Sequence, residues 1–350
     1  MMIRFEWKKL VSMPAVFCIF IALLVAGLLL NWVSLHNQIR SGGVAEKQFQ
    51  EYMERLEGPL TPEKEQFLDK EKQRIDEALS NKEEMQEKYE RDEISKEEFA
   101  AFNENCFYAQ QHKDPFQRVW DRYQMIKESP NSAWFVYDTC WSHYFLNGIT
   151  GMALTLGIFF LFSAFVGNEF LSGMWQYLAS SKNGRNVSAA AKLELGLLVA
   201  FAFSTLLFAF RLLLYYCAFS LPAWDAPLQS LTPFFGVTKT LTVGEFLWLS
   251  LLCQIIMALA LAVWTIALGW LMKGGASPLF LLAGLYVVPM VIKGYATQLY
   301  AFCIPGAVHG AEVVSMLSGN SPPILFLQIF YLAAGVLVYV FCILRREKNR

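Results

Sequence analysis

A series of apolar runs, most of them long enough to cross a lipid bilayer as an α-helix, constrains the fold of this chain more than any other feature. The runs cover residues 14–33, 144–166, 193–219, 246–272 and 324–344, with a shorter run at 277–292. A helix needs about 20 apolar residues to cross the hydrocarbon core. Only 17% of the residues are charged, against about 25% in soluble domains. The sequence therefore predicts an all-α polytopic membrane protein with six transmembrane helices.

A charged segment separates the first two runs. Residues 34–142 contain 15 Lys or Arg and 23 Asp or Glu, whereas the rest of the chain contains 14 and 7. We expect this insert to be a helical extracytoplasmic domain, because long polar segments are translocated largely regardless of charge. Its helix signals predict four helices, at 46–57, from Pro62 to about Arg91, after a Ser95/Glu98 capping box, and from Asp114-Pro115.

The first 33 residues combine a short amphipathic start with the first apolar run. A helix here would place Ile3, Trp7 and Leu10 on one face, and the other face would carry Arg4, Lys8 and Lys9. This pattern suits an elbow helix lying in the cytoplasmic interface of the membrane. Simple flanking positive charge is the alternative. The run that follows lacks an Ala-x-Ala cleavage site, so we interpret it as an uncleaved span.

The segment 167–192 is polar and lies between two apolar runs, so both of its ends enter the membrane from the same side. Connecting segments rich in Lys and Arg stay in the cytosol. We therefore expect this loop and both termini to be cytoplasmic, and residues 34–142 to be outside. The cationic residues on the expected cytoplasmic side are Arg4, Lys8, Lys9, Lys182, Arg185, Lys192, Lys273, Arg345, Arg346, Lys348 and Arg350, against Lys239 and Lys293 in the short outer connections.

The order of residues in this loop resembles the coupling region of ABC transporter permeases of the type-2 (ABC-2) exporter class. Glu169 follows a membrane run and Gly173 comes four residues later; a short amphipathic segment, a Ser pair and a basic residue precede the Lys that opens the next run. In that family a short helix of the loop docks into a groove on a separate ATPase. The matching and neighbouring residues here are Glu169, Phe170, Gly173, Met174, Tyr177, Ser180, Ser181, Arg185 and Lys192.

The resemblance also implies an organisation for the remaining chain. It implies an elbow helix carrying Arg4, Trp7, Lys8 and Lys9, transmembrane helices two to six within 143–350, and a re-entrant region at 294–321. It further implies a second permease subunit, identical or homologous, an ABC ATPase that binds ATP and Mg²⁺, a transported substrate and a multi-pass location in a bacterial plasma membrane. An extracytoplasmic insert of this kind occurs in relatives of the class.

The chain itself carries no motif for catalysis. It has no Gly-rich phosphate-binding loop ending in Gly-Lys-Ser/Thr, no His-Glu-x-x-His and no Gly-x-Ser-x-Gly. The four histidines are isolated, and the seven cysteines have no spacing typical of a metal site. We therefore expect no cofactor, no metal, no nucleic-acid partner and no enzymatic activity in this chain.

Two further features leave alternatives open. Arg211 lies within the run 193–219, where a charge indicates either a pairing or substrate-facing role or a side chain that reaches the nearby interface. Cys106 and Cys140 lie in the insert and form either a disulfide, if the insert is outside the cell, or two packed thiols.

A membrane-anchored sensor or assembly protein is the alternative to a permease. In that case the extracytoplasmic segment 34–142 would bind a ligand or partner, and the spans would anchor it. The two hypotheses differ in the ATPase partner, which only the permease requires, and in the importance of the loop 167–192.

Overall fold

The computed structural model describes residues 2–128, 134–180, 184–219, 221–316 and 324–348. The chain divides into two compact units. The first, here called the membrane unit, comprises Met1–Val33, His143–Ser220 and Glu245–Arg350. The second, here called the insert unit, comprises Ser34–Ser142 and Leu221–Gly244.

Twelve helices contribute to the membrane unit, counted over the described residues. They are α1 (Met2–Val11), α2 (Pro14–Ser41), α7 (Thr139–Leu146), α8 (Ile149–Leu171), α9 (Met174–Ser180), α10 (Gly184–Phe219), α11 (Val243–Met272), α12 (Ala276–Ile292), α13 (Thr297–Phe302), α14 (Ile304–Val308), α15 (Gly310–Met316) and α16 (Ile324–Lys348). Helices α2, α7 and α11 also extend across the boundary with the insert unit.

Five helical segments are long and apolar enough to cross a membrane: Pro14–Ser41, Thr139–Leu171, Asn186–Ala218, Val243–Met272 and Ile324–Leu344. This count covers the described residues and rests on length and composition. It confirms the prediction of an all-α membrane protein. Of the six expected spans, the remaining one corresponds to α12, which has only 17 residues and contains Pro289.

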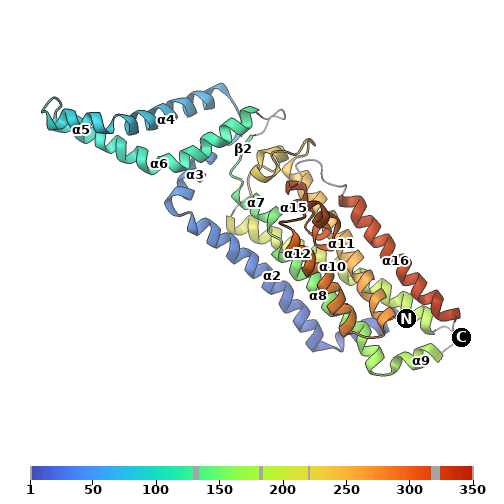
Figure 1. Cartoon of the computed structure of the whole chain (residues 1–350). Helices are drawn as coiled ribbons and strands as arrows, with labels where there is room; N and C mark the ends of the chain where they lie inside the picture. The colour runs from blue at the N-terminus through green and yellow to red at the C-terminus, as the bar shows by residue number, and fades with distance from the viewer. Residues whose placement is uncertain (1, 129–133, 181–183, 220, 317–323, 349–350) are drawn as a thin grey trace. The chain divides into compact units, whose positions relative to one another are not determined.

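The core of the membrane unit lies between α2, α8, α10 and α11, which run alongside one another (Figure 1). Phe20 of α2 meets Phe203 of α10 edge-on, with 4.8 Å between ring centroids. Helices approach closely where one of them carries glycine. At Gly167 of α8, an added Cβ would lie 2.5 Å from the Cα of Gly275, so the connection between α11 and α12 packs against the end of α8.

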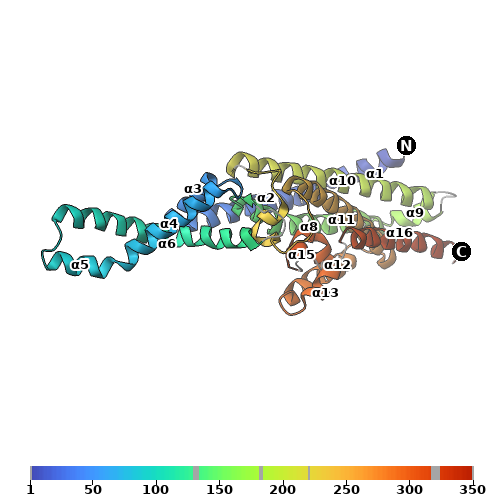
Figure 2. The ribbon, with the colours of Figure 1, turned by 90° about the horizontal axis from the view of Figure 1, so that it is seen from above.

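One end of the membrane unit brings together segments far apart in the sequence. Helices α1 and α9 and the C-terminal end of α16 all lie there in both views (Figures 1 and 2). The close approach of Gly167 to Gly275 adds the connection between α11 and α12 to the same end. We call this end of the membrane unit the α9 end.

Three short helices, α13 to α15, lie in the region 294–321, for which the family resemblance implies re-entrant helices; residues 317–321 lie outside the described chain. The ammonium of Lys293 pairs with Glu312, and Tyr300 donates a hydrogen bond to the same carboxylate at 3.2 Å. Gly306 packs on the backbone, since an added Cβ would lie 2.1 Å from the carbonyl oxygen of Tyr300. The region is therefore a packed part of the unit, and re-entry into a bilayer stays a prediction.

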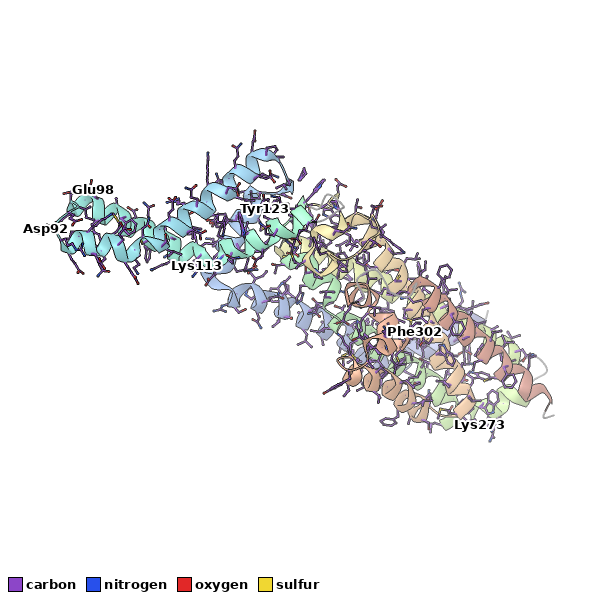
Figure 3. The ribbon with its side chains drawn as sticks, turned by 45° about the horizontal axis from the view of Figure 1, so that its top comes forward. Asp92, Glu98, Lys113, Tyr123, Lys273 and Phe302 are labelled. Atoms are coloured by element: carbon purple, nitrogen blue, oxygen red, sulfur yellow. The ribbon has the colours of Figure 1, made fainter. Side chains whose placement is uncertain are left out.

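The insert unit is mainly a set of helices. It contains α3 (Gly43–Arg55), α4 (Pro62–Ser80), α5 (Lys82–Glu90), α6 (Lys96–Glu128), two 3₁₀ turns at Leu228–Ser230 and Thr232–Phe234, and the short strands β1 (Gly58–Pro59) and β2 (Trp134–Phe135). The strands pair antiparallel, with Gly58 opposite Phe135 and Pro59 opposite Trp134. Helices α5 and α6 meet at a turn near Asp92 and Glu98, and α6 runs from there past Lys113 and Tyr123 (Figure 3).

Two boundaries predicted within the insert differ in the structure. The helix expected from Pro62 to Arg91 is divided at Asn81 into α4 and α5. The helix expected to begin at Asp114-Pro115 does not begin there, because α6 continues through Pro115. An interior proline costs about 3 kcal/mol or more. Pro115 and the following Phe116, Val119 and Tyr123 are buried in the helix packing, which offsets that cost.

The segment 221–244, which belongs to the expected outer connection that carries Lys239, packs as part of the insert unit. The backbone N–H and the hydroxyl of Thr232 each donate a hydrogen bond to Asp138 at 2.7 Å. Trp141 donates its indole N–H to the carbonyl oxygen of Pro222 at 2.8 Å. Asp138 also pairs with Arg122 of α6 at 2.7 Å, so this carboxylate joins three parts of the unit.

The capping box at the start of α6 is confirmed. The amide of Glu98 donates to the hydroxyl of Ser95 at 3.2 Å, and the amide of Ser95 donates to the Glu98 carboxylate at 3.0 Å. The box satisfies two backbone amides that the first helical turn would otherwise leave without partners.

Replacing Ser95 by Ala should therefore destabilise the beginning of α6 by about 1 kcal/mol. Hydrogen exchange of the amides in 96–100 would become faster, while the middle of α6 would change little. Ser80→Ala, at an exposed serine near the end of α4, is the matched control and should alter exchange little. Equal effects of the two substitutions would contradict a capping role for Ser95.

Candidate functional site

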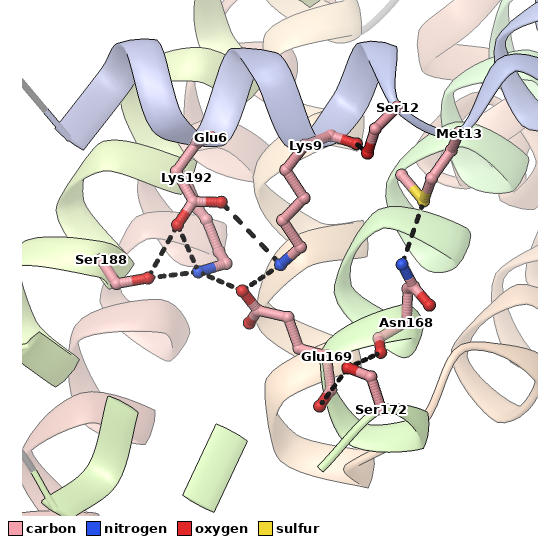
Figure 4. A network of polar contacts seen from close by, with 9 residues as sticks. All are labelled: Glu6, Lys9, Ser12, Met13, Asn168, Glu169, Ser172, Ser188 and Lys192. Carbon is pink, nitrogen blue, oxygen red and sulfur yellow. Dashed lines mark hydrogen bonds and ion pairs between the residues drawn. The ribbon is translucent and has the colours of Figure 1, made fainter. Parts of the chain in front are cut away.

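Four charged side chains from three helices meet inside the membrane unit (Figure 4). Glu6 and Lys9 belong to α1, Glu169 lies near the end of α8, and Lys192 lies in α10. The Lys192 ammonium is 3.0 Å from a carboxylate oxygen of Glu6 and 2.9 Å from one of Glu169. Lys9 pairs with Glu169 and lies 4.0 Å from the second oxygen of Glu6. We call these four residues the ion cluster.

The ion cluster is almost completely excluded from solvent. The side chains of Glu6 and Lys192 are 0% exposed, Glu169 is 1% exposed and Lys9 is 10% exposed. A buried charge costs several kcal/mol, and only close pairing and further hydrogen bonds offset that cost. Here two ammonium and two carboxylate groups sum to zero charge, and Ser188 adds a hydrogen bond to Glu6 at 2.9 Å.

Lys9, at the edge of the ion cluster, shows how burial and charge act on a pKa in opposite directions. Burial lowers the pKa of its ammonium, and the carboxylate of Glu169 opposes that shift. The ammonium of Lys9 also lies 5.2 Å from the centre of the Phe165 ring, and that of Lys192 lies 5.9 Å from the centre of Trp270. The cluster thereby connects α1, the end of α8 and the beginning of the apolar part of α10.

The structure places Glu169 differently from the surface position that direct docking on an ATPase would require. Its carboxylate points into the ion cluster, so it is not available to a docked protein. Its neighbour Phe170 is partly buried and packs against Trp175, with 5.5 Å between ring centroids. Trp175 in turn meets Trp270 of α11 at 4.9 Å. These aromatic contacts fix the start of α9 on the membrane unit.

The end of α8 and the start of α9 also carry exposed apolar side chains. Leu171 is 86% exposed, Tyr177 is 79% exposed and Met174 is 38% exposed. We call these three residues the α9 patch. Gly173 lies between α8 and α9 with φ of +70°, in the left-handed region that favours glycine. Arg185 lies at the start of α10; its side chain, and residues 181–183, fall outside the description.

Helix α1 buries one residue from each of the two faces expected from the sequence. Leu10 is buried, but Ile3 is 39% exposed and Trp7 is 46% exposed. Arg4 and Lys8 are exposed as expected. Lys9, expected to be an interfacial cation, instead belongs to the ion cluster. The buried face of α1 is formed by Glu6, Lys9 and Leu10 because these residues lie one turn apart, at i, i+3 and i+4.

Arg211 supports the end of a neighbouring helix. Its guanidinium donates hydrogen bonds to the carbonyl oxygens of Tyr144 and, at 3.3 Å, of Asn147, and it lies 4.3 Å from the centre of the Tyr144 ring. The last carbonyls of a helix lack partners within the helix, and cationic side chains satisfy them well. These contacts correspond to the pairing role for Arg211, whereas a place for Arg211 in a transport path stays a prediction.

Cys106 and Cys140 are both buried and are not joined by a disulfide, so the disulfide alternative is not present in the structure. The thiol of Cys106 donates to the carbonyl oxygen of Ala78 at 3.0 Å, which fixes it between α6 and α4. Among the described residues, no group of three or more His, Cys, Asp or Glu side chains could hold a metal ion.

Sequence reasoning missed Glu6 as a member of the site. Its only signal was a single acidic residue in an otherwise basic amphipathic segment, on the same face as Lys9 and Leu10. A comparison of the chain with protein-family models, with curated proteins and with solved structures finds no match in any of the three.

Proposed function

We propose that this chain is the membrane-spanning permease subunit of an ATP-driven exporter of the type-2 ABC class. Two such subunits, identical or homologous, would enclose the path of the transported substrate. A separate ABC ATPase would bind ATP and Mg²⁺ and dock on the loop 167–192. In this proposal α12 serves as the fifth of six spans, both termini and α9 are cytoplasmic, the insert unit is extracytoplasmic, and the membrane is a bacterial plasma membrane.

The observation that carries the proposal is the combination of an exposed α9 patch with a buried ion cluster that includes Glu169, two residues before Leu171. Leu171 at the end of α8, and Met174 and Tyr177 on the short helix α9, expose apolar surface between two long apolar helices. Protein interfaces are anchored by such exposed apolar and aromatic side chains. The ion cluster links the same connection to α1 and α10. A push on α9 would therefore be transmitted to three helices of the membrane unit.

The position of the α9 patch agrees with the direction expected for coupling. Helix α1, the end of α16 and the connection that contains Lys273 lie at the same α9 end of the unit (Figures 1 and 3). These are the segments that carry the cations assigned to the cytosol by sequence. In the proposed cycle the helices would rock as rigid bodies, which is a known way for proteins to switch between two states.

The α9 patch provides a test by co-purification. The chain would be purified in mild detergent with the ABC ATPase encoded nearest to its gene, and ATP turnover would be measured. Leu171→Asp and Tyr177→Asp should each weaken the association at least about tenfold, equivalent to about 1.4 kcal/mol, because each places a charge in an apolar contact. Stimulated ATP turnover should fall in parallel.

Val44→Asp is the matched control, since Val44 is 71% exposed but lies in the insert unit. It should leave association and turnover unchanged. If no ATPase associates with the chain, or if the two patch variants bind as tightly as the control, the permease proposal fails. A membrane-anchored sensor or assembly protein would then be the better hypothesis.

A further inference from the structure

A cavity of about 460 Å³ opens on the membrane unit between α11, α12, α13, α14 and α16. Pockets that bind small molecules have volumes of about 300–1,000 Å³. The inner wall includes Met257, Leu261 and Leu282, each at most 3% exposed. The rim includes Leu285 and Phe302, which are 50% and 55% exposed. The cavity therefore has a packed floor and an open side.

The polar atoms that border the cavity are already bonded within the protein. Trp264 donates its indole N–H to the carbonyl oxygen of Tyr331 at 2.9 Å. The hydroxyl of Tyr331 donates to the carbonyl oxygen of Phe302 at 2.5 Å. Among the described residues, no charged side chain lines the cavity, and Cys303 supplies a thiol as the remaining polar group of this lining. A polar ligand would lose its hydrogen bonds to water here without replacement.

The surroundings of the cavity indicate where its occupant comes from. Met257, Leu261 and Trp264 lie in the central part of Val243–Met272, and Tyr331 lies in Ile324–Leu344; both segments are candidate membrane spans. The outer surface of such helices faces the hydrocarbon of a bilayer. The open rim at Leu285 would then be in contact with lipid chains, which have the apolar character that the lining demands.

We propose that this cavity binds one acyl chain of a membrane lipid. The headgroup of the lipid remains outside, in the interfacial region, and the chain enters past Leu285 to rest against Leu261 and Leu282. This inference is independent of the proposed transport function, because it requires only that the apolar helices lie in a bilayer. A second copy of this chain, inserting an apolar side chain, is the competing occupant.

The probe is a phosphatidylcholine with a photoreactive diazirine in the middle of one acyl chain. The full-length protein would be reconstituted in vesicles of this lipid diluted with ordinary phosphatidylcholine and then irradiated. Mass spectrometry of the peptides should find labelling concentrated in 257–268, 281–289 and 302–304, which line the cavity. Exposed faces of α2 should be labelled several-fold less per residue, because a diazirine beside an open helix face is surrounded mainly by other acyl chains, whereas one inside the cavity is surrounded by protein.

Leu285→Trp tests the site, because the larger ring would occupy the entrance. Labelling of 257–268 should fall at least threefold. Val287→Trp is the matched control: Val287 is 44% exposed, lies on the same helix and points about 160° away from Leu285 on an ideal helix of about 100° per residue. It should leave the labelling of 257–268 unchanged.

Two results would overturn the proposal. One is labelling that is spread evenly over the exposed apolar faces and responds equally to both variants. The other is cross-linking of Cys303 in one copy of the chain to α12 in a second copy, with no lipid adduct in 257–268. This result would assign the cavity to a contact between two protein chains.

Discussion

Lys192→Met is expected to destabilise the membrane unit by about 3–5 kcal/mol, since removal of one partner leaves an uncompensated buried charge. Lys192 is 0% exposed and contacts the carboxylates of both Glu6 and Glu169. After the substitution only Lys9 would remain beside two buried carboxylates. The apparent Tm of the purified protein should fall, and the amides of α1 should exchange faster because α1 is held by Glu6 and Lys9.

A second substitution separates charge from packing in this prediction. Lys192→Met combined with Glu169→Gln restores a net charge of zero to the ion cluster, with Glu6 and Lys9 left as a pair. The double variant should recover much of the lost stability, because residues in one network couple strongly. If the double variant is less stable than Lys192→Met alone, charge balance is not what holds these helices together.

The membrane character of the chain could be predicted because it depends on local composition. An apolar run of 20 residues specifies a spanning helix whatever lies elsewhere in the chain. The capping box of Ser95 and Glu98 was predictable for the same reason, since both partners lie within three residues. Such features need no knowledge of tertiary contacts.

The features that sequence reasoning missed all depend on contacts over long separations. Pro115 indicates a helix boundary locally, but burial of the neighbouring side chains keeps α6 continuous. Asp138 and Thr232 are 94 residues apart, so nothing near either one predicts that 221–244 joins the insert unit. The same holds for Glu6 and Lys192, which are 186 residues apart.

Two residues of the ion cluster that join α8 to α10 were named from the sequence, but their contact with each other was not predicted. The segment around Glu169 was identified from the order of its residues, and the structure brings Glu169 together with Lys192, both named from the sequence. The resemblance to the coupling region of type-2 exporters assigned Glu169 to the segment that docks on an ATPase. In the structure Leu171 and Tyr177 are the exposed residues, whereas Glu169 is buried and pairs with Lys9.

Arg122→Met should destabilise the insert unit by about 3–5 kcal/mol at neutral pH, for the same reason as Lys192→Met but outside the membrane spans. Arg122 and Asp138 are 5% and 6% exposed and pair at 2.7 Å. Arg91→Met is the control, because Arg91 pairs with Glu87 on the exposed surface and such pairs contribute about 0–1 kcal/mol. Hydrogen exchange of 134–138 and 228–234 in the full-length protein localises the effect.

The pH dependence of the destabilisation by Arg122→Met tests whether the charge of Arg122 is its cause. Burial alone would raise the pKa of Asp138, but the charge of Arg122 and the hydrogen bonds from Arg122 and Thr232 outweigh it and hold the pKa below its ordinary value. In the wild type, the stability contributed by the ionised carboxylate is therefore present above the ordinary pKa of about 3.9 and is lost only as the pH falls through the lower native pKa.

In Arg122→Met the opposing charge is gone and only the hydrogen bonds from Thr232 oppose burial, so the pKa of Asp138 should rise above its wild-type value. The carboxyl group would then take up a proton at a higher pH than in the wild type, and a neutral carboxyl group costs much less to bury. The stability difference between variant and wild type should therefore narrow on acidification. A difference that stays constant from pH 7 down to the ordinary pKa of about 3.9 would show that Arg122 acts through packing of its side chain, not through its charge.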